Sequence, residues 1–493
     1  MRRAFHLLVS AGVALIASAG LASAKDSVTI GMVLEPPGLD PTTAPAAAIG
    51  EVTHYNIFEG LTKINEDFSV TPLLADKWDF SPDLKTLTFT LKPNVKFQDG
   101  EPFSSKDVKF SFERFAAKDS TNKDKGFFAS IESIDTPNPT TVVLKFKEPS
   151  FEALFHLGMN TAVILDEKSA ANEATNPVGT GPYKLASWTK GASITLNKWD
   201  GYRDPAKIPL VRATFRFISD PSAAVAAMLA GDVDDFPRFA NIQSIDQFKG
   251  DPRFQVLIGG TEGKTILAMN NKKKPLDELK ARQAIAYAID RRAIIDGAEN
   301  GLGTPIGSHM TPNDPGYVDL TGMYPHDPAK SKELLKEAGV TTPLDLSLIL
   351  PPPQYARLGG QIIAAELAQV GINAKIQEVE WAQWLSGVYK DHNYDLTIIS
   401  HVEPLDIGIY ANPNYYFQYD SPAFQAIYAK VTSAPNLEAY KAALGEAQRK
   451  IAEDCVNAFL FQLPNVTVAS ANLQGLWKNA PIFVNDLSEM SWK

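Results

Sequence analysis

The sequence predicts an α/β protein of two or more domains, and its length and apolar patterning lead to this expectation. The chain has 493 residues, far more than one hydrophobic core ordinarily supports. Segments that alternate apolar and polar residues, typical of strands, are interspersed with segments that repeat apolar residues every three or four positions, typical of helices. Such interspersion predicts mixed sheets covered by helices, and clefts between tandem domains that hold ligands.

Strand and helix patterns follow one another near the amino terminus. Residues 27–34 alternate and then meet a Glu-Pro-Pro-Gly turn, and residues 86–91 alternate strictly. Ser104 and Ser105 are candidate N-caps of a helix that follows. The positions predicted to face a core are Leu87, Phe89 and Leu91 in the strand and Val108, Phe112 and Phe115 in the helix.

The second half of the chain repeats the same alternation. Residues 281–289 have the apolar spacing of an amphipathic helix. Asp327, followed by proline, predicts the start of another helix, which Gly339 ends. A further apolar stripe ends at Gly371, and residues 372–379 are predicted to form a strand.

The amino terminus has the pattern of a cleaved secretory signal. Arg2 and Arg3 precede an apolar stretch over residues 7–21, and the small-residue sequence Ala22-Ser23-Ala24 follows. A membrane-spanning helix would need about 20 apolar residues and no such small-residue site. We therefore expect a signal peptide over residues 1–24.

Charge and cysteine content exclude some partners. The formal net charge of −10 argues against nucleic acid and anionic membranes as partners. Cys455 is the only cysteine, so neither an intramolecular disulfide nor a zinc site built from cysteines is possible. It lies in a stretch with helical spacing, where a buried, unreactive thiol is expected.

Three sequence blocks occur in a fixed order along the chain. The first runs from PLLADKW at residues 72–78 to DVKFSFER at residues 107–114; the second is VGTGPY at 178–183, and the third is RQAIAYAIDR at 282–291. In the second block, residues 179–182 are predicted to form a turn in which Gly179 and Gly181 permit a positive φ. Together the blocks resemble the bacterial extracytoplasmic solute-binding proteins of family 5, which include dipeptide-, oligopeptide-, nickel- and opine-binding proteins of ABC importers.

The resemblance implies a periplasmic-binding-protein-like α/β fold: two lobes joined by a hinge, with an extra inserted subdomain in the first lobe. Such proteins close around a ligand by rotation at the hinge. The expected division is a signal peptide at 1–24, lobe I at 25–52, 170–262 and 470–493, the inserted subdomain at 53–169, and lobe II at 263–469.

The same resemblance implies a binding function and no enzymatic activity. The expected protein is a monomer in the periplasm of a Gram-negative bacterium. It binds a small peptide or peptide-like ligand without a cofactor or metal and delivers it to inner-membrane permease subunits that work with two ATP-binding subunits. The alternative is a secreted hydrolase acting on peptides. The chain contains neither Gly-x-Ser-x-Gly nor His-Glu-x-x-His, although a triad assembled in space leaves no such local motif.

The candidate site lies in residues 400–410. A buried ligand ammonium needs a carboxylate partner, and the resemblance implies an aspartate in a Gly-Trp…Asp-Pro-like loop. Here both dipeptides are missing, but Asp406 is the best positional match, and Glu403 is a second acid nearby. The other interpretation of Asp406 is an aspartate that stabilises a turn.

Further site residues are expected around this loop. His401 could donate a hydrogen bond or titrate, or be a satisfied structural histidine. Trp384 and Tyr410 are predicted to line the pocket, because the relatives place aromatic residues there. Arg357 is a candidate partner for a ligand carboxylate, with a solvated helix-face arginine as the alternative.

Overall fold

The computed structural model describes residues 25–44, 46–239 and 241–493. The predicted signal peptide lies outside this range. An 11-stranded mixed sheet runs through the molecule in the order β15-β14-β16-β12-β17-β11-β1-β10-β9-β8, with β13 also paired to β17. The predicted α/β class is confirmed. None of the helices in the described ranges combines the length and apolarity needed to cross a membrane.

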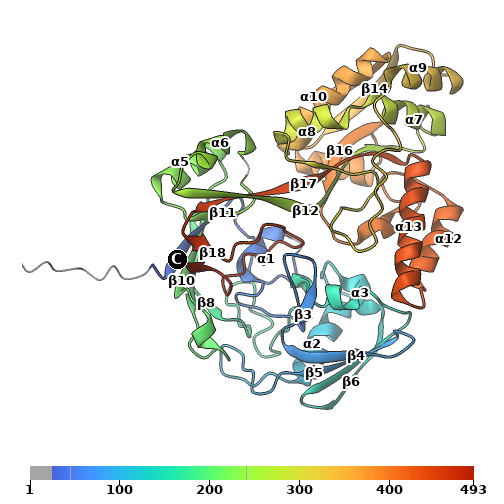
Figure 1. Cartoon of the computed structure of the whole chain (residues 1–493). Helices are drawn as coiled ribbons and strands as arrows, with labels where there is room; N and C mark the ends of the chain where they lie inside the picture. Colours follow the sequence, from blue (N-terminus) through green and yellow to red (C-terminus); the bar gives the residue numbers. More distant parts are fainter. Residues whose placement is uncertain (1–24, 45, 240) are drawn as a thin grey trace, which may run out of the picture.

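Two long antiparallel strands connect the two ends of this sheet (Figure 1). They are β12 (Phe254–Met269) and β17 (Asn457–Ser470). Their pairing shifts register between Gly260 and Lys264, opposite Gln462–Pro464. Elements on either side of this irregularity form two groups, called here the first lobe and the second lobe.

The first lobe contains the β8 end of the sheet. Its core includes Ile30, Phe215 and Leu487 and so joins segments far apart in sequence. A satellite core packs Val466 and Val468 of β17 against α5 and α6. This packing favours a lobe boundary near Pro464 over the predicted one after Ala469. The elements are β1 (Ser27–Met32), α1 (Ala47–Thr53), β8 (Tyr183–Thr189), β9 (Ser193–Lys198), β10 (Arg212–Phe217), α5 (Pro221–Ala230), β11 (Asp235–Phe236), α6 (Asp246–Lys249), β18 (Leu473–Gln474) and β19 (Ser491–Trp492).

A smaller sheet of order β4-β5-β7-β6 belongs to the same lobe. The predicted strand at 86–91 is β5, and the side chains of Leu87, Phe89 and Leu91 are buried, as predicted. The predicted helix is α2, and Ser104 forms a capping box with Asp107 at its start. The elements here are β2 (Thr62–Ile64), β3 (Val70–Pro72), β4 (Ala75–Phe80), β5 (Thr86–Leu91), α2 (Ser105–Ala116), α3 (Lys125–Ala129), β6 (Ile131–Asn138), β7 (Thr141–Phe146) and α4 (Ala153–His156).

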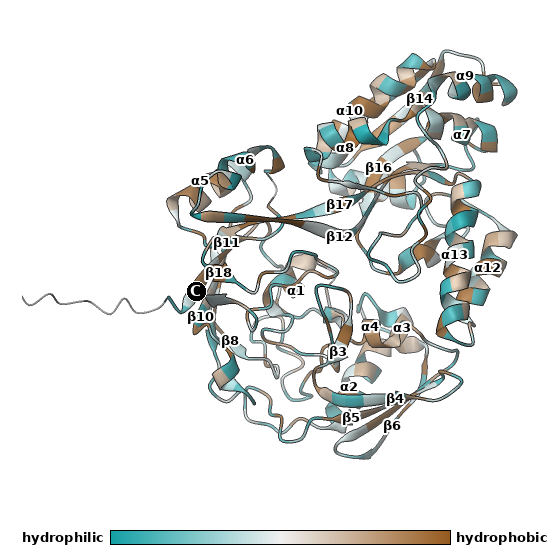
Figure 2. Ribbon diagram, viewed as in Figure 1, coloured by the Kyte–Doolittle hydropathy of each residue, from teal (hydrophilic) through white to brown (hydrophobic). Residues whose placement is uncertain are grey.

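The second lobe packs helices on the β15 end of the large sheet. Asp327 caps α9 through Lys330 N at 2.9 Å, as predicted. Figure 2 shows hydrophilic and hydrophobic residues together on the outer helices α9 and α13, as expected where a helix buries one face. The elements are α7 (Leu279–Ala288), α8 (Arg291–Glu299), β13 (Thr304–Pro305), α9 (Pro328–Glu337), β14 (Leu344–Leu350), α10 (Gln354–Gln369), β15 (Ile372–Glu378), α11 (Trp381–Trp384), β16 (Leu396–His401), α12 (Pro422–Thr432) and α13 (Leu437–Glu453).

Cys455 differs in part from its predicted setting. The thiol is buried as expected, but the residue lies between α13 and β17 with φ of 47°, outside any helix. Burial raises the pKa of the thiol to about 12, so the unreactive form dominates at neutral pH.

The glycines at 179 and 181 serve a different purpose from the predicted one. Neither glycine is among the described residues that have a positive φ. Instead, a Cβ atom added at Gly179 would lie 1.9 Å from the carbonyl oxygen of Ile57, and one at Gly181 would lie 2.4 Å from that of Asn56. These glycines allow close approach of two backbone segments.

Gly179→Ala is therefore expected to destabilise the protein by at least about 1–3 kcal/mol, because the backbone of Ile57 must move. Gly126→Ala is the matched control: it lies in α3, and nothing is within 4 Å of its added Cβ. Chemical denaturation monitored by fluorescence measures both. Equal stability of the two variants would contradict the close-approach explanation.

Candidate ligand-binding site

A cavity of about 500 Å³ lies between the two lobes. Its first-lobe wall includes Met159, Arg238 and the segment 480–483, and its second-lobe wall includes Glu299 and the segment 402–404. The volume falls within the range of small-molecule sites, about 300–1,000 Å³. Most of the exposed wall surface is apolar, so the few polar groups would set the orientation of a ligand.

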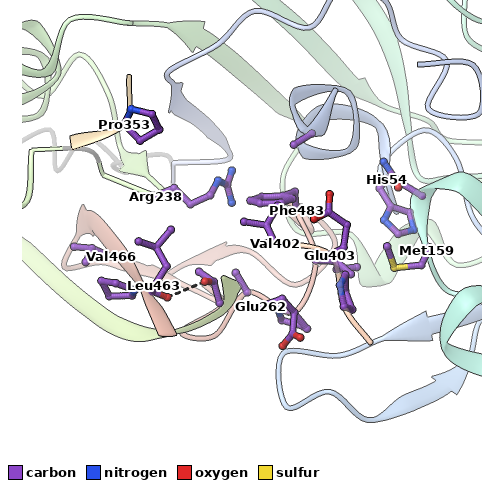
Figure 3. Close-up of a pocket in the computed structure, with 18 of the residues that line it drawn as sticks. His54, Met159, Arg238, Glu262, Pro353, Val402, Glu403, Leu463, Val466 and Phe483 are labelled. Atoms are coloured by element: carbon purple, nitrogen blue, oxygen red, sulfur yellow. Dashed lines mark hydrogen bonds between the residues drawn. The ribbon is translucent and has the colours of Figure 1, made fainter. Parts of the chain in front are cut away.

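Two ion pairs occupy the cavity wall. Arg238 lies 2.7 Å from Glu51, and its guanidinium is 5.6 Å from the centre of the Phe483 ring. Figure 3 shows the Arg238 guanidinium directed toward Phe483. Lys123 of the first lobe lies 3.1 Å from Glu403 of the second. This second pair joins the two lobes at the cavity.

A second contact between the lobes lies near the small sheet. The hydroxyl group of Tyr440 donates a hydrogen bond to the carboxylate of Glu152. The Tyr440 ring also stacks on Phe151 with 5.1 Å between centroids. The observed conformation therefore brings α13 against the first lobe.

His54 supplies a neutral polar group to the wall. Burial, followed by the nearby charge of Lys63, lowers the pKa of this histidine to about 3. Neither ring nitrogen has a hydrogen-bond partner in the described structure. Both nitrogens are also shielded from solvent, so His54 is a neutral, unpartnered group behind the wall surface.

Asp406 lies in an internal charge cluster instead of on the cavity wall. Its carboxylate is 2.8 Å from Nζ of Lys264, which is 1% exposed, and 3.2 Å from Nε2 of His309. Burial opposes ionisation, but the charge of Lys264 and the contact with His309 outweigh it and hold the pKa of Asp406 well below its ordinary value. The lysine thus occupies the place that a ligand ammonium would need.

The same cluster contains the described residues best placed to hold a metal ion. Ligand atoms of His309, His401 and Asp406 lie within 4.8 Å of one another. However, His309 Nδ1 and His401 Nε2 are hydrogen-bonded to tyrosine hydroxyl groups, and Lys264 already neutralises the carboxylate. This chemistry favours an internal ion pair over a metal site.

Among the residues predicted from the sequence, Glu403 lines the cavity, whereas His401, Trp384, Tyr410 and Arg357 do not. The His401 ring stacks on Tyr416. Trp384 donates a hydrogen bond to Thr397 at 3.0 Å. Tyr410 accepts one from Asn457 at 3.0 Å. Arg357 lies 3.4 Å from Glu378. Their role as ligand contacts stays a prediction, and these contacts favour structural roles.

Sequence reasoning missed Glu299, Arg238 and His54. Glu299 ends an amphipathic helix before Asn300-Gly301 and has the sequence context of a solvated residue. Arg238 follows the two-residue strand β11, which no periodicity can reveal. These residues meet only because β12 and β17 bring the lobes together, so no local motif marks them.

The sheet that continues through two lobes and the cavity between them are the architecture of a solute-binding protein. The family model of the bacterial extracellular solute-binding proteins, family 5, matches residues 69–423. The chain belongs to this family.

Curated relatives and a solved structure agree with this assignment. Di/tripeptide-binding protein 1 of Pseudomonas aeruginosa (strain UCBPP-PA14) is 29% identical over 71% of each chain. The glutathione-binding protein GsiB of Shigella boydii serotype 4 (strain Sb227) is 28% identical over 78% of this chain and 76% of its own. The PBP AgaA of A. tumefaciens R10, in complex with agropinic acid, is 26% identical with a TM-score of 0.80, covering 95% of this chain and 99% of its own.

Family membership decides between the two functions predicted from the sequence. The chain is a solute-binding component of an ABC importer, and the hydrolase alternative is not supported. Members of this family are substrate-binding proteins that work with permease components.

Proposed function

We propose that the protein captures a small peptide or peptide-like amine in the cavity between its lobes. It then delivers the ligand, as a monomer in the periplasm of a Gram-negative bacterium, to a permease with two ATP-binding subunits. The mature chain begins near Lys25. The observation that carries the proposal is the cavity of about 500 Å³ with apolar walls and a few polar groups contributed by both lobes.

The polar groups suit the chemistry of a peptide. Carboxylates at the wall can pair with the ammonium group of a peptide. Curated relatives named for di- and tripeptides and for glutathione support this ligand class. All of these ligands combine amide groups with ionised ends.

Ligand identity is tested by mass spectrometry of material released when gently purified protein is denatured. We expect a stoichiometric, chemically unchanged peptide or peptide conjugate. The mass of the protein in the same sample reports whether the chain begins near Lys25. Released hydrolysis products in place of intact ligand would contradict the binding function.

The recovered ligand, added back to stripped protein, is expected to stabilise and compact the molecule. At about 100 times its Kd a ligand adds about 2.7 kcal/mol to the free energy of unfolding. The irregular pairing of β12 and β17 between Gly260 and Lys264 is a candidate hinge for closure around the ligand. Differential scanning calorimetry and small-angle X-ray scattering measure the two effects. Stabilisation without any decrease in radius of gyration would exclude hinge closure.

A further inference from the structure

The acids that line the cavity differ in whether a partner neutralises them. Glu403 is paired with Lys123. The carboxylate of Asp124 accepts a hydrogen bond from the hydroxyl group of Thr161. Among the described acids that line the cavity, Glu262 and Glu299 have buried carboxylate oxygens without a hydrogen-bond partner.

Glu262 lines the cavity but also adjoins the internal cluster through Asp314 and Lys264. Both of its carboxylate oxygens are shielded. Burial, and then the adjacent carboxyl group of Asp314, raises the pKa of Glu262, while Lys264 nearby opposes that rise. A protonated Glu262 beside Asp314 explains its missing partners without a ligand.

Glu299 has no acidic neighbour of this kind, and burial alone raises its pKa. Its side chain is on the cavity wall and only 3% of the residue is exposed, yet Oε2 has no hydrogen-bond partner. It is the last residue of α8, where the helix dipole disfavours negative charge. The burial of the side chain, its place at the end of a helix and the missing counter-charge all disfavour the ionised form of Glu299. A buried charge of this kind is costly unless another charge pairs with it.

The elements packed around Glu299 offer no internal cation. Strands β13 and β17 carry no charged residue. On α8, Arg292 pairs with Asp296 at 2.7 Å, and Arg291 donates hydrogen bonds to the main-chain oxygens of Ile306, Thr321 and Tyr324. On α10, Arg357 lies near Glu378. Tyr355, also on α10, faces the same cavity with its hydroxyl group bonded to Ser400 N.

The cations across the cavity are likewise engaged. Lys123 pairs with Glu403, and Arg238 pairs with Glu51. Arg238 also lies near Asp235: burial raises the pKa of this aspartate to about 7, and the charge of Arg238 opposes that rise. When Glu299 is ionised, its counter-charge must therefore come from outside the protein.

We propose that Glu299 binds the ammonium group of the ligand, so that the second lobe holds the cationic end of the peptide. This proposal rests on the proposed function and assigns the ammonium to a residue other than Asp406, whose carboxylate is occupied by Lys264. The required ligand class is a peptide or peptide-like amine with a free amino group. N-acylated peptides are excluded as good ligands.

The test compares two probe mixtures on protein stripped of ligand by unfolding and refolding. One is a tripeptide library with free amino termini, and the other is the same library N-acetylated. Native mass spectrometry gives relative affinities for the wild type, Glu299→Gln and Glu366→Gln. Glu366 is the matched control because burial also raises its pKa to about 7, but it does not line the cavity.

We expect the wild type and Glu366→Gln to prefer free amino termini. Glu299→Gln is expected to lose about thirtyfold or more in affinity for them, with little change for acetylated peptides. A residue with only a structural role would change both affinities together. Melting curves of the ligand-free variants show whether each one folds.

Other outcomes separate the two proposals. If Glu299→Gln keeps the preference for free amino termini, or the wild type binds both libraries equally, Glu299 is not the ammonium site, although peptide binding stands. If the wild type binds neither library, peptide binding fails. Thermal stabilisation by primary amines, from propylamine to phenethylamine, then tests the ammonium site by itself. Stabilisation of the wild type but not of Glu299→Gln supports the site. Any other result overturns it.

Discussion

Asp406→Asn is expected to lower the free energy of unfolding by about 3–5 kcal/mol, the usual effect of removing one member of a buried ion pair. The substitution leaves Lys264, itself 1% exposed, without its counter-charge at 2.8 Å. It also weakens the contact with His309. Urea denaturation of the ligand-free protein measures the change.

Replacing both members of the pair provides the control. Asp406→Leu combined with Lys264→Met removes both charges and is expected to recover much of the lost stability. The sequence-based interpretation predicts instead that Asp406→Asn weakens only ligands with a free ammonium group. Unchanged stability together with such a selective loss would place Asp406 in the binding site.

Binding of a free-amine peptide is expected to weaken about fiftyfold from pH 7 to pH 5, because the fraction of ionised Glu299 falls from about one half to one hundredth. Burial raises the pKa of Glu299 to about 7, and only the ionised carboxylate pairs with an ammonium. Affinity falls again above the pKa of an α-amino group, about 7.7–8.0. Isothermal titration calorimetry across this range measures the profile.

Other buried groups must be separated from this effect. Asp406 stays ionised and His401, whose pKa burial and then His309 lower to about 3, stays neutral over the same range. Glu262 also has a raised pKa but sits against Asp314 and Lys264. Glu299→Gln should flatten the acid limb of the profile. An unchanged pH dependence in this variant would assign the titration to another group.

The fold was predictable wherever the local pattern and the tertiary packing demand the same arrangement. The alternation at 86–91 matches β5, whose inward face meets a core, and the cap at Asp327 matches the start of α9. The predicted turn at Gly179 does not explain this glycine, since its close approach to Ile57 depends on a segment more than 100 residues away.

The site was less predictable because charge pairing is decided in space. Asp406 was chosen for its position along the chain, but only the structure shows Lys264 of β12 against it. Glu299 looks solvated in sequence, although the packing of α8 buries it. The sequence shows how many acidic residues the chain has. Which of them lacks a partner in the folded protein depends on every neighbouring strand and helix.

The connection through β12 and β17 limits the ways in which the halves of the molecule can move. Two strands paired on both sides of the irregularity between Gly260 and Lys264 resist stretching and sliding, since either would break a ladder of hydrogen bonds. Right-handed twist, by contrast, varies readily between paired strands. We therefore expect opening to follow a single angular coordinate. One pair of spectroscopic probes flanking the Lys123–Glu403 contact should then describe the whole motion, and distances measured elsewhere should all be functions of that angle.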